Sequence, residues 1–158
     1  MRVSWGFDVH RFGGQPPLRL AGVTVDARRG VVATSDGDVV AHAVADALLG
    51  VAGLGDLGAH FPSSDPQWAD VDSMNLLSRV VAMCSGYRVD FVDVTVIAED
   101  VRVDAHRDAM RGNLAGVVGI DPSLVSVKAT TTDGMGAIGA GEGIAATAVV
   151  TAQPIVTS

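Results

Sequence analysis

The sequence predicts an α+β fold in which one layered sheet carries helices on a face. Apolar residues with strand-like alternation recur along the chain and are clearest over residues 89–98. Between such stretches lie runs whose apolar residues have helical spacing, the first over residues 35–50. Strands that alternate with helices in one chain bury their apolar faces by packing as layers.

The composition limits both the architecture and the partners. The length suits a single domain over residues 1–158, and 48% hydrophobic but only 4% aromatic residues predict a core of Val, Ala and Leu. The formal net charge of -7 argues against a nucleic-acid-binding face. The lone Cys84 excludes a disulfide framework and is expected to fill the core. With no signal-peptide pattern and no apolar run of about 20 residues, we expect a cytoplasmic protein without a membrane segment.

The elements follow in chain order, each ended by glycine, proline or a polar turn. We expect Ser35 to cap the first helix, with Asp36 and Asp38 near its positive N-terminus, so capping explains both carboxylates better than metal binding does. The expected elements are strand 2–10, a hairpin over 18–25, a brief extended piece at 31–34, helix 35–49, helix 74–85, strand 89–98, helix 105–118, strand 124–132 and strand 144–156.

Asp8, His10 and His42 form a candidate metal site. Residues two apart on a strand share a face, so Asp8 and His10 can aim at one point, and His42 lies on the first helix. Three nitrogen and oxygen ligands with a vacant fourth position are typical of a zinc that acts on a substrate. Asp46, one helical turn after His42, is a candidate acceptor for its second ring nitrogen. By spacing alone, a polar strand edge and an ordinary helical histidine are the commoner explanation.

Two glycine-rich loops are candidate ligand sites. The loop over residues 50–65 combines glycines with acidic residues and hydroxyls that suit a ligand's hydroxyl groups. Residues 128–143 place threonines, Asp133 and close-spaced glycines where backbone amides can approach phosphate oxygens, and Asp133 suits magnesium. The same composition also fits a plain glycine-rich hairpin loop. It is not a Walker loop, because its Gly-x-x-x-x-Gly-Lys-Ser/Thr pattern is absent.

Five motifs in this order cover nearly the whole chain and resemble one family, the 2-C-methyl-D-erythritol 2,4-cyclodiphosphate synthases of the non-mevalonate isoprenoid pathway. The motifs are Gly-Phe-Asp-Val-His at 6–10, Ser-Asp-Gly-Asp at 35–38 with His42 and Asp46, Gly-Asp-Leu-Gly at 55–58 with Phe-Pro at 61–62, Lys-Ala-Thr-Thr-Thr at 128–132, and Gly-Glu-Gly at 141–143.

The resemblance implies a homotrimer in which single-layer mixed β-sheets surround a three-fold axis and active sites lie between subunits. It implies one Zn²⁺ per subunit on Asp8, His10 and His42, and Mg²⁺ or Mn²⁺ on the substrate diphosphate beside Asp133. The small-molecule substrate would be 4-diphosphocytidyl-2-C-methyl-D-erythritol 2-phosphate. Its 2-phosphate would attack the β-phosphorus and expel CMP, a lyase reaction that needs no protein nucleophile.

The resemblance also assigns the site residues. Thr34 and Thr131 would contact the transferring phosphate and the transition state, and the segment 98–103 would wall the cytosine from a neighbouring subunit. The implied substrate contacts are Asp8, Val9, His10, Thr34, Ser35, Asp56, Leu57, Gly58, Phe61, Pro62, Ser63, Ser64, Asp65, Ala98, Glu99, Asp100, Val101, Arg102, Val103, Thr130, Thr131, Thr132 and Asp133.

Several positions depart from the family pattern. Thr34 stands where His is common, Ser63 where Asp is usual and Asp133 where Glu is usual, while Ala137 and Ala140 replace an aromatic residue and an Arg. Val-Arg at 101–102 replaces a Pro-Lys-like pair. Because Ala140 replaces the Arg that is typical of the family, binding of an anionic ligand at the trimer axis is in doubt.

The sequence leaves three other interpretations open. One is a zinc-dependent nucleotide phosphohydrolase with water as acceptor, a second is a catalytically silent cytidine-nucleotide-binding trimer, and a third is a purely structural metal, whose removal would unfold the chain.

Overall fold

The computed structural model of the chain describes residues 1–156, so the last two residues of the expected domain 1–158 lie outside the described residues. Its main sheet has the order β1-β6-β4-β5. The first three strands in that order pair antiparallel and β4 pairs with β5 in parallel, so the sheet is mixed, as expected. The bounds are β1 (Arg2–Arg11), β4 (Tyr87–Ile97), β5 (Val125–Thr130) and β6 (Gly143–Pro154).

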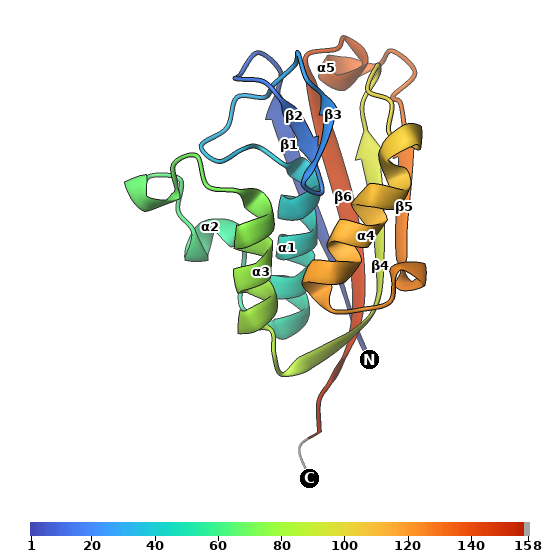
Figure 1. Cartoon of the computed structure of the whole chain (residues 1–158). Helices are drawn as coiled ribbons and strands as arrows, with labels where there is room; N and C mark the ends of the chain where they lie inside the picture. The colour runs from blue at the N-terminus through green and yellow to red at the C-terminus, as the bar shows by residue number, and fades with distance from the viewer. Residues whose placement is uncertain (157–158) are drawn as a thin grey trace.

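Three helices cover one face of this sheet (Figure 1). They are α1 (Val39–Ala52), α3 (Ser73–Met83) and α4 (Arg107–Val118). Helix α1 packs on β1 and β6, α4 packs on β5, and α3 packs against both helices. The small second sheet pairs β2 (Leu18–Leu20) with β3 (Val23–Asp26), as the expected hairpin. No helix within residues 1–156 is long and apolar enough to cross a membrane.

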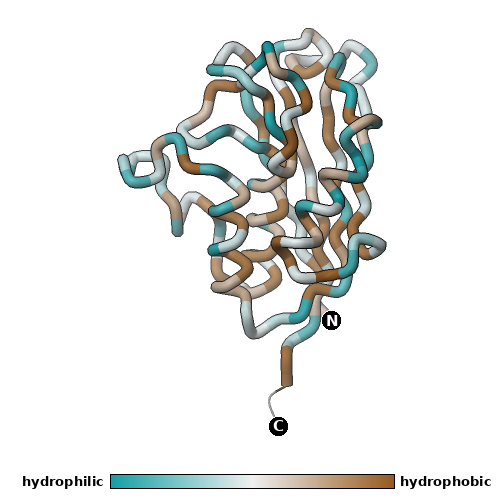
Figure 2. The backbone as a smooth tube through the Cα atoms, viewed as in Figure 1, coloured by the Kyte–Doolittle hydropathy of each residue, from teal (hydrophilic) through white to brown (hydrophobic). Residues whose placement is uncertain are grey.

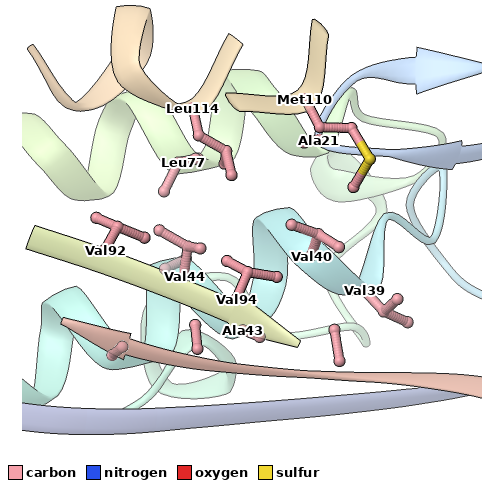
Figure 3. Close-up of a cluster of buried hydrophobic side chains, with 14 of the residues drawn as sticks. Ala21, Val39, Val40, Ala43, Val44, Leu77, Val92, Val94, Met110 and Leu114 are labelled. Carbon is pink, nitrogen blue, oxygen red and sulfur yellow. The ribbon is translucent and has the colours of Figure 1, made fainter. Parts of the chain in front are cut away.

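The core lies between the helices and the sheet (Figure 3). Val92 and Val94 of β4 alternate toward the helices and meet Val44 of α1, Leu77 of α3 and Leu114 of α4, all of them fully buried. Hydrophobic residues run along these interior elements, while the hydrophilic ones gather in loops and on outer helix faces (Figure 2). Cys84 is buried, as expected, and its burial raises the pKa of the thiol.

Glycine at position 6 lets α1 lie directly on β1. A Cβ built on Gly6 would stand 2.0 Å from the backbone oxygen of Ala43 and 2.8 Å from the backbone nitrogen of Ala47. Any larger residue would therefore push the helix off the strand. This contact sets the distance between the helix that carries His42 and the side chains of Asp8 and His10, which follow Gly6 on the same strand face.

Asp38 caps α1 and also joins it to the hairpin. Its side chain is fully buried, and Oδ1 accepts hydrogen bonds from the backbone N–H groups of Val40 and Ala41. The N–H of Ala21 also donates to Oδ1, at 2.9 Å, and that of Gly22 donates to Oδ2, at 2.7 Å. Burial raises the pKa of Asp38, and the backbone hydrogen bonds oppose that rise.

The structure corrects several local predictions. Asp38 rather than Ser35 is the N-cap of the first helix, which starts at Val39 because its first turn needs the buried carboxylate. Residues 31–34 form only one isolated bridge, from Val31 to Phe12. Both glycine-rich loops contain short helices that the sequence analysis did not expect. They are α2 (Leu57–His60) in the first loop and α5 (Gly136–Gly139) in the second, and an unexpected 3₁₀ turn (Pro66–Trp68) directly follows the first loop. Two further 3₁₀ turns span Asp104–His106 and Pro122–Leu124.

Replacing Asp38 should destabilise the fold far more than removing an exposed cap. Asp38→Ala leaves four N–H donors without their acceptor, and we expect a loss of about 3–5 kcal/mol. Asp38→Asn keeps the oxygen that accepts three of them and should cost about 1–2 kcal/mol. Urea unfolding at fixed protein concentration measures both. The control is Asp72→Ala, which removes the partly exposed N-cap of α3 and should cost about 1 kcal/mol. Equal losses for all three variants would contradict the prediction.

Candidate metal centre and substrate cavity

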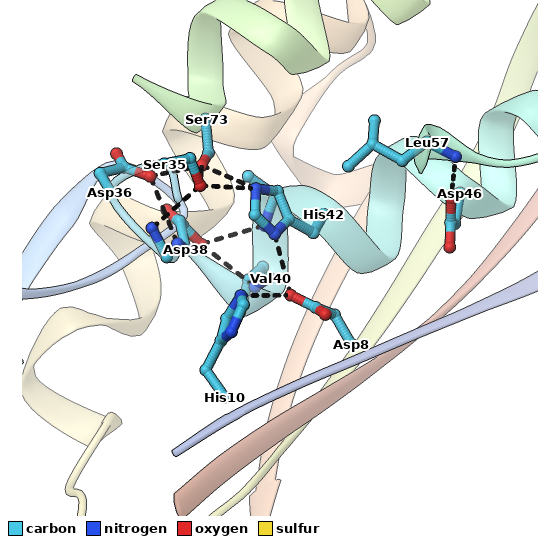
Figure 4. A network of polar contacts seen from close by, with 12 residues as sticks. Asp8, His10, Ser35, Asp36, Asp38, Val40, His42, Asp46, Leu57 and Ser73 are labelled. Carbon is cyan, nitrogen blue, oxygen red and sulfur yellow. Dashed lines mark hydrogen bonds and ion pairs between the residues drawn. The ribbon is translucent and has the colours of Figure 1, made fainter. Parts of the chain in front are cut away.

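Asp8, His10 and His42 converge on one point (Figure 4). Asp8 Oδ2 lies 3.1 Å from His10 Nε2 and 2.9 Å from His42 Nδ1. One ligand atom from each residue lies within 4.8 Å of the other two, and all three side chains are partly buried. The strand alternation that the sequence analysis used for Asp8 and His10 is therefore confirmed, and α1 brings His42 to the same place.

The donor set suits a divalent cation. His10 Nε2 is buried and has no hydrogen-bond partner of good geometry among residues 1–156, although it faces the Asp8 carboxylate. Burial alone would raise the pKa of Asp8, but its close contacts with the imidazoles of His10 and His42 lower it well below its ordinary value. Two imidazole nitrogens and one ionised carboxylate oxygen directed at one point match the ligand chemistry of zinc. These three residues would hold the ion.

The outer nitrogen of His42 contacts two hydroxyl groups. His42 Nε2 lies 2.9 Å from Ser73 Oγ and 3.3 Å from Ser35 Oγ. The prediction that Asp46 accepts from His42 is wrong, because Asp46 Oδ1 instead accepts from the backbone N–H of Leu57 at 2.7 Å (Figure 4). Asp46 thus holds the start of α2, and its side chain points away from the imidazole.

A cavity of about 200 Å³ adjoins the three converging side chains. Its wall contains Thr34, Ser35, Gly58, Phe61 and Ser63 from the predicted site, beside His10, His42 and Leu57. The sequence analysis missed three further lining residues, Trp68, Val71 and Leu76. The ring of Trp68 meets Phe61 edge-on with centroids 4.9 Å apart, so the aromatic contact that places it could not be read from the sequence.

The other half of the predicted site lines a separate cavity of about 150 Å³. It shares no lining residue with the cavity beside His42. The cavity beside His42 includes His10 of β1 and the second cavity includes Thr130 of β5, and these are the two edge strands of the sheet (Figure 1). The residues around the second cavity are Ala98, Glu99, Val101, Arg102, Val103, Asp104, Arg107, Ala129, Thr130 and Thr131. A single copy therefore does not bring all the predicted contacts together.

Two acidic residues fasten the segment 98–103. Glu99 accepts hydrogen bonds from the backbone N–H groups of Thr132 and Gly134, at 3.3 and 3.2 Å, and so ties this segment to the threonine-rich loop. Asp100 accepts two hydrogen bonds from Arg29, at 2.6 and 2.8 Å, and this pairing lowers the pKa of Asp100. The Arg29 guanidinium also lies 4.7 Å from the Phe12 ring centroid. The carboxylates of Glu99 and Asp100 are thus used within the fold.

Other predicted contacts also have structural roles. Asp56 caps α2 by accepting from the N–H of Ala59, and Asp65 caps the turn at Pro66–Trp68. The carbonyl oxygens of Thr34 and Pro62 accept from the N–H groups of Asp70 and Asp65. Val9 faces the open side of the sheet, away from Asp8 and His10, so only its backbone is near the site.

The remaining predicted contacts differ in exposure: Ala98 is buried, whereas Asp133 lies in an exposed loop. Ser64 is exposed. Thr132 Oγ1 donates to the carbonyl oxygen of Met135, and Ala98 N donates to that of Thr130. Asp133 has a φ of 52° and lies within hydrogen-bond distance of Thr131 Oγ1, at 3.4 Å. Because the Asp133 carboxylate is exposed and not engaged with a basic group among the described residues, it is available to a ligand.

The fold and the site define an α+β protein in which three converging side chains could hold a metal ion. The chain belongs to the YgbB family, whose model matches residues 1–153. A relative from Salinibacter ruber, named 2-C-methyl-D-erythritol 2,4-cyclodiphosphate synthase, is 51% identical over 155 residues, which are 97% of this chain and 99% of the relative. A relative of the same name from Alkalilimnicola ehrlichii is 53% identical over 154 residues, 95% of this chain and 93% of the relative.

Solved structures agree with this assignment. The bifunctional IspDF from Campylobacter jejuni superposes with a TM-score of 0.94 at 39% identity, covering 97% of this chain and 42% of that protein, so this chain spans less than half of it. The CDP complex of IspF from Plasmodium falciparum gives a TM-score of 0.84 at 29% identity, covering 98% of this chain and 97% of that one.

Zinc affinity should depend on pH through His42. Burial opposes its protonation, but the hydrogen bond and charge of Asp8 raise its pKa above the ordinary value. The protonated ring competes with zinc, so affinity should still increase as pH rises above about 6.5. The same pKa shift affects the stability of the metal-free chain. The ion pair between protonated His42 and Asp8 stabilises the fold below about pH 6.5, and this contribution is lost as pH rises through the raised pKa of His42. Competition with a chelating dye between about pH 6 and 9 measures the affinity. A plateau reached below about pH 6.5 would contradict the prediction.

Proposed function

We propose that the chain converts 4-diphosphocytidyl-2-C-methyl-D-erythritol 2-phosphate into 2-C-methyl-D-erythritol 2,4-cyclodiphosphate and CMP. An oxygen of the 2-phosphate forms a bond to the β-phosphorus, and the bond from that phosphorus to the bridging oxygen breaks. The bridging oxygen leaves with the α-phosphate as CMP. No atom of the protein becomes covalently attached, so catalysis consists of positioning and charge stabilisation.

The observation that carries this proposal is the convergence of Asp8, His10 and His42 beside a cavity with hydroxyl and apolar walls. Relatives about half identical over nearly the whole chain carry the synthase name, which favours the synthase over a nucleotide phosphohydrolase or a silent nucleotide binder. The solved relative with CDP bound supports a cytidine nucleotide as the ligand.

The residues of this chain have separate roles in the proposed reaction. Zn²⁺ held by Asp8, His10 and His42 would polarise the β-phosphate and stabilise its developing charge. Ser35 and Thr34 present hydroxyl groups from the wall of the same cavity, and Gly58 leaves room for the sugar. On the second cavity, Thr131 offers a hydroxyl to the phosphate chain and the segment 98–103 surrounds the base. Asp133, one methylene shorter than the usual Glu, would bind Mg²⁺ or Mn²⁺ on the diphosphate, directly or through water.

We also propose a homotrimer in which the open sheet faces surround a three-fold axis. On β1, Val3, Trp5, Phe7 and Val9 alternate on the face without helices and are 43–62% exposed. Such a continuous apolar stripe is typical of a surface covered by another chain. Assembly would also bring the cavity beside His42 together with the second cavity of a neighbouring copy and so complete the substrate site.

The reaction can be followed by a phosphorus NMR time course of the diphosphocytidyl substrate with the protein, zinc and magnesium. We expect CMP and a cyclic diphosphate from the unaltered chain, and a rate at least about 100-fold lower from His42→Ala, which lacks one metal ligand. Asp108→Ala is the control and should retain activity, because its side chain is 96% exposed on α4 and lines neither cavity. CMP with a linear product would favour the phosphohydrolase, and nucleotide binding without turnover the silent binder.

Trp5→Glu tests the assembly. The ring stacks on Phe7 with centroids 5.8 Å apart and is 61% exposed in one copy, so a carboxylate there would be buried unpaired between copies. We expect at least about a tenfold weaker trimer, measured by sedimentation equilibrium. Met83→Glu makes a similar change on the helical side and should leave the trimer intact. An unaltered chain that sediments as a monomer would refute the assembly itself.

A further inference from the structure

A chain of polar contacts begins at the outer nitrogen of His42 and ends at Asp36 (Figure 4). Ser73, the first residue of α3, is 1% exposed, and its Oγ lies 2.9 Å from His42 Nε2. The same hydroxyl donates a hydrogen bond to Asp36 Oδ1. Asp36 Oδ1 is itself held by the backbone N–H of Asp38, at the cap of α1.

The direction of these hydrogen bonds follows from the chemistry of the groups. The Ser73 hydroxyl donates to the Asp36 carboxylate, so its single proton is used on that side. The Ser73 oxygen is then an acceptor toward His42, and His42 must carry its proton on Nε2. Its other ring nitrogen, Nδ1, is the atom 2.9 Å from Asp8. Without a metal ion, the Nδ1–H of the protonated ring donates to Asp8; once a metal ion displaces that proton, Nδ1 presents a lone pair to the point where Asp8 and His10 converge.

We propose that Ser73, oriented by Asp36, is a positioning residue that fixes the tautomer and ring orientation of His42 for metal binding. This inference rests on the proposed zinc site and concerns residues that do not contact the metal or the substrate. Hydrogen bonds to the second nitrogen of a metal-ligating histidine commonly hold its ring and strengthen its donation to the metal.

Neither Asp46 nor Ser35, the other polar residues near His42, can take the place of Ser73. Asp46 is engaged with Leu57. The Ser35 hydroxyl is farther from His42 Nε2, at 3.3 Å, accepts from the N–H of Gly37 and lines the substrate cavity. Ser73 is buried behind the ring, so water does not readily replace it.

The test is zinc affinity of the full-length chain, measured by competition with a chelating dye. We expect Ser73→Ala to bind zinc about 10- to 100-fold more weakly than the unaltered chain. Asp72→Ala is the matched control, because it weakens the start of the same helix without touching His42, and should leave zinc affinity unchanged. Ser73→Thr keeps the hydroxyl and should restore most of the affinity. If Ser73→Ala binds zinc as tightly as the unaltered chain, the inference is wrong.

A second measurement reads the tautomer directly. In the zinc-loaded protein, long-range proton–nitrogen NMR should place the His42 proton on Nε2, and Ser73→Ala should make that proton exchange faster with water. Asp36→Ala keeps the Ser73 oxygen but frees its proton, and should weaken zinc binding even if Ser73→Ala does not fold. A proton on Nδ1 would overturn the inference. If the unaltered chain itself does not bind zinc, the proposed metal site fails instead, and the two failures are distinguished.

Discussion

The buried carboxylate of Asp38 is the interaction on which the site depends. It accepts four backbone hydrogen bonds, two from the first turn of α1 and two from the turn of the β2–β3 hairpin. His42 lies one turn further along and its N–H donates to the carbonyl oxygen of the same Asp38. Because the cap fixes both the start and the direction of α1, it also determines where the imidazole lies. A single desolvated group therefore joins the stability of the fold to the geometry of the metal centre.

Strand β1 gives each of its two faces a different function. The face with Gly6, Asp8 and His10 meets α1, and the absence of a Cβ at Gly6 lets the helix come close enough for His42 to reach Asp8. The other face carries Trp5 and its apolar neighbours and meets no helix. A shift of one residue in the pairing of β1 with β6 would exchange the two faces and place the carboxylate and imidazole on the open side. The register thus fixes both the candidate site and the open apolar face of β1.

The sequence predicted what depends on local periodicity. It identified the sheet, the three large helices and the convergence of Asp8, His10 and His42, because alternation and helical spacing report which face a residue occupies. It failed where a side chain chooses between partners distant in sequence. Asp46 bonds to Leu57 rather than His42, and Ser73 reaches His42 across 31 positions, neither of which spacing can reveal. Short helices in the glycine-rich loops were missed for a related reason, since caps such as Asp56 act without an apolar pattern.

The charges around the two cavities explain why a phosphorylated substrate needs both. No Lys or Arg lines the cavity beside His42 within residues 1–156, and Thr34 offers only an uncharged hydroxyl. A cation held by Asp8, His10 and His42 would supply the positive charge that a phosphate in this cavity requires. The second cavity includes Arg102 and Arg107 but none of those ligands. The cavity beside His42 would obtain positive charge from a bound cation, and the second cavity obtains it from Arg102 and Arg107. Neither cavity alone can therefore balance the charge of a diphosphate and a third phosphate.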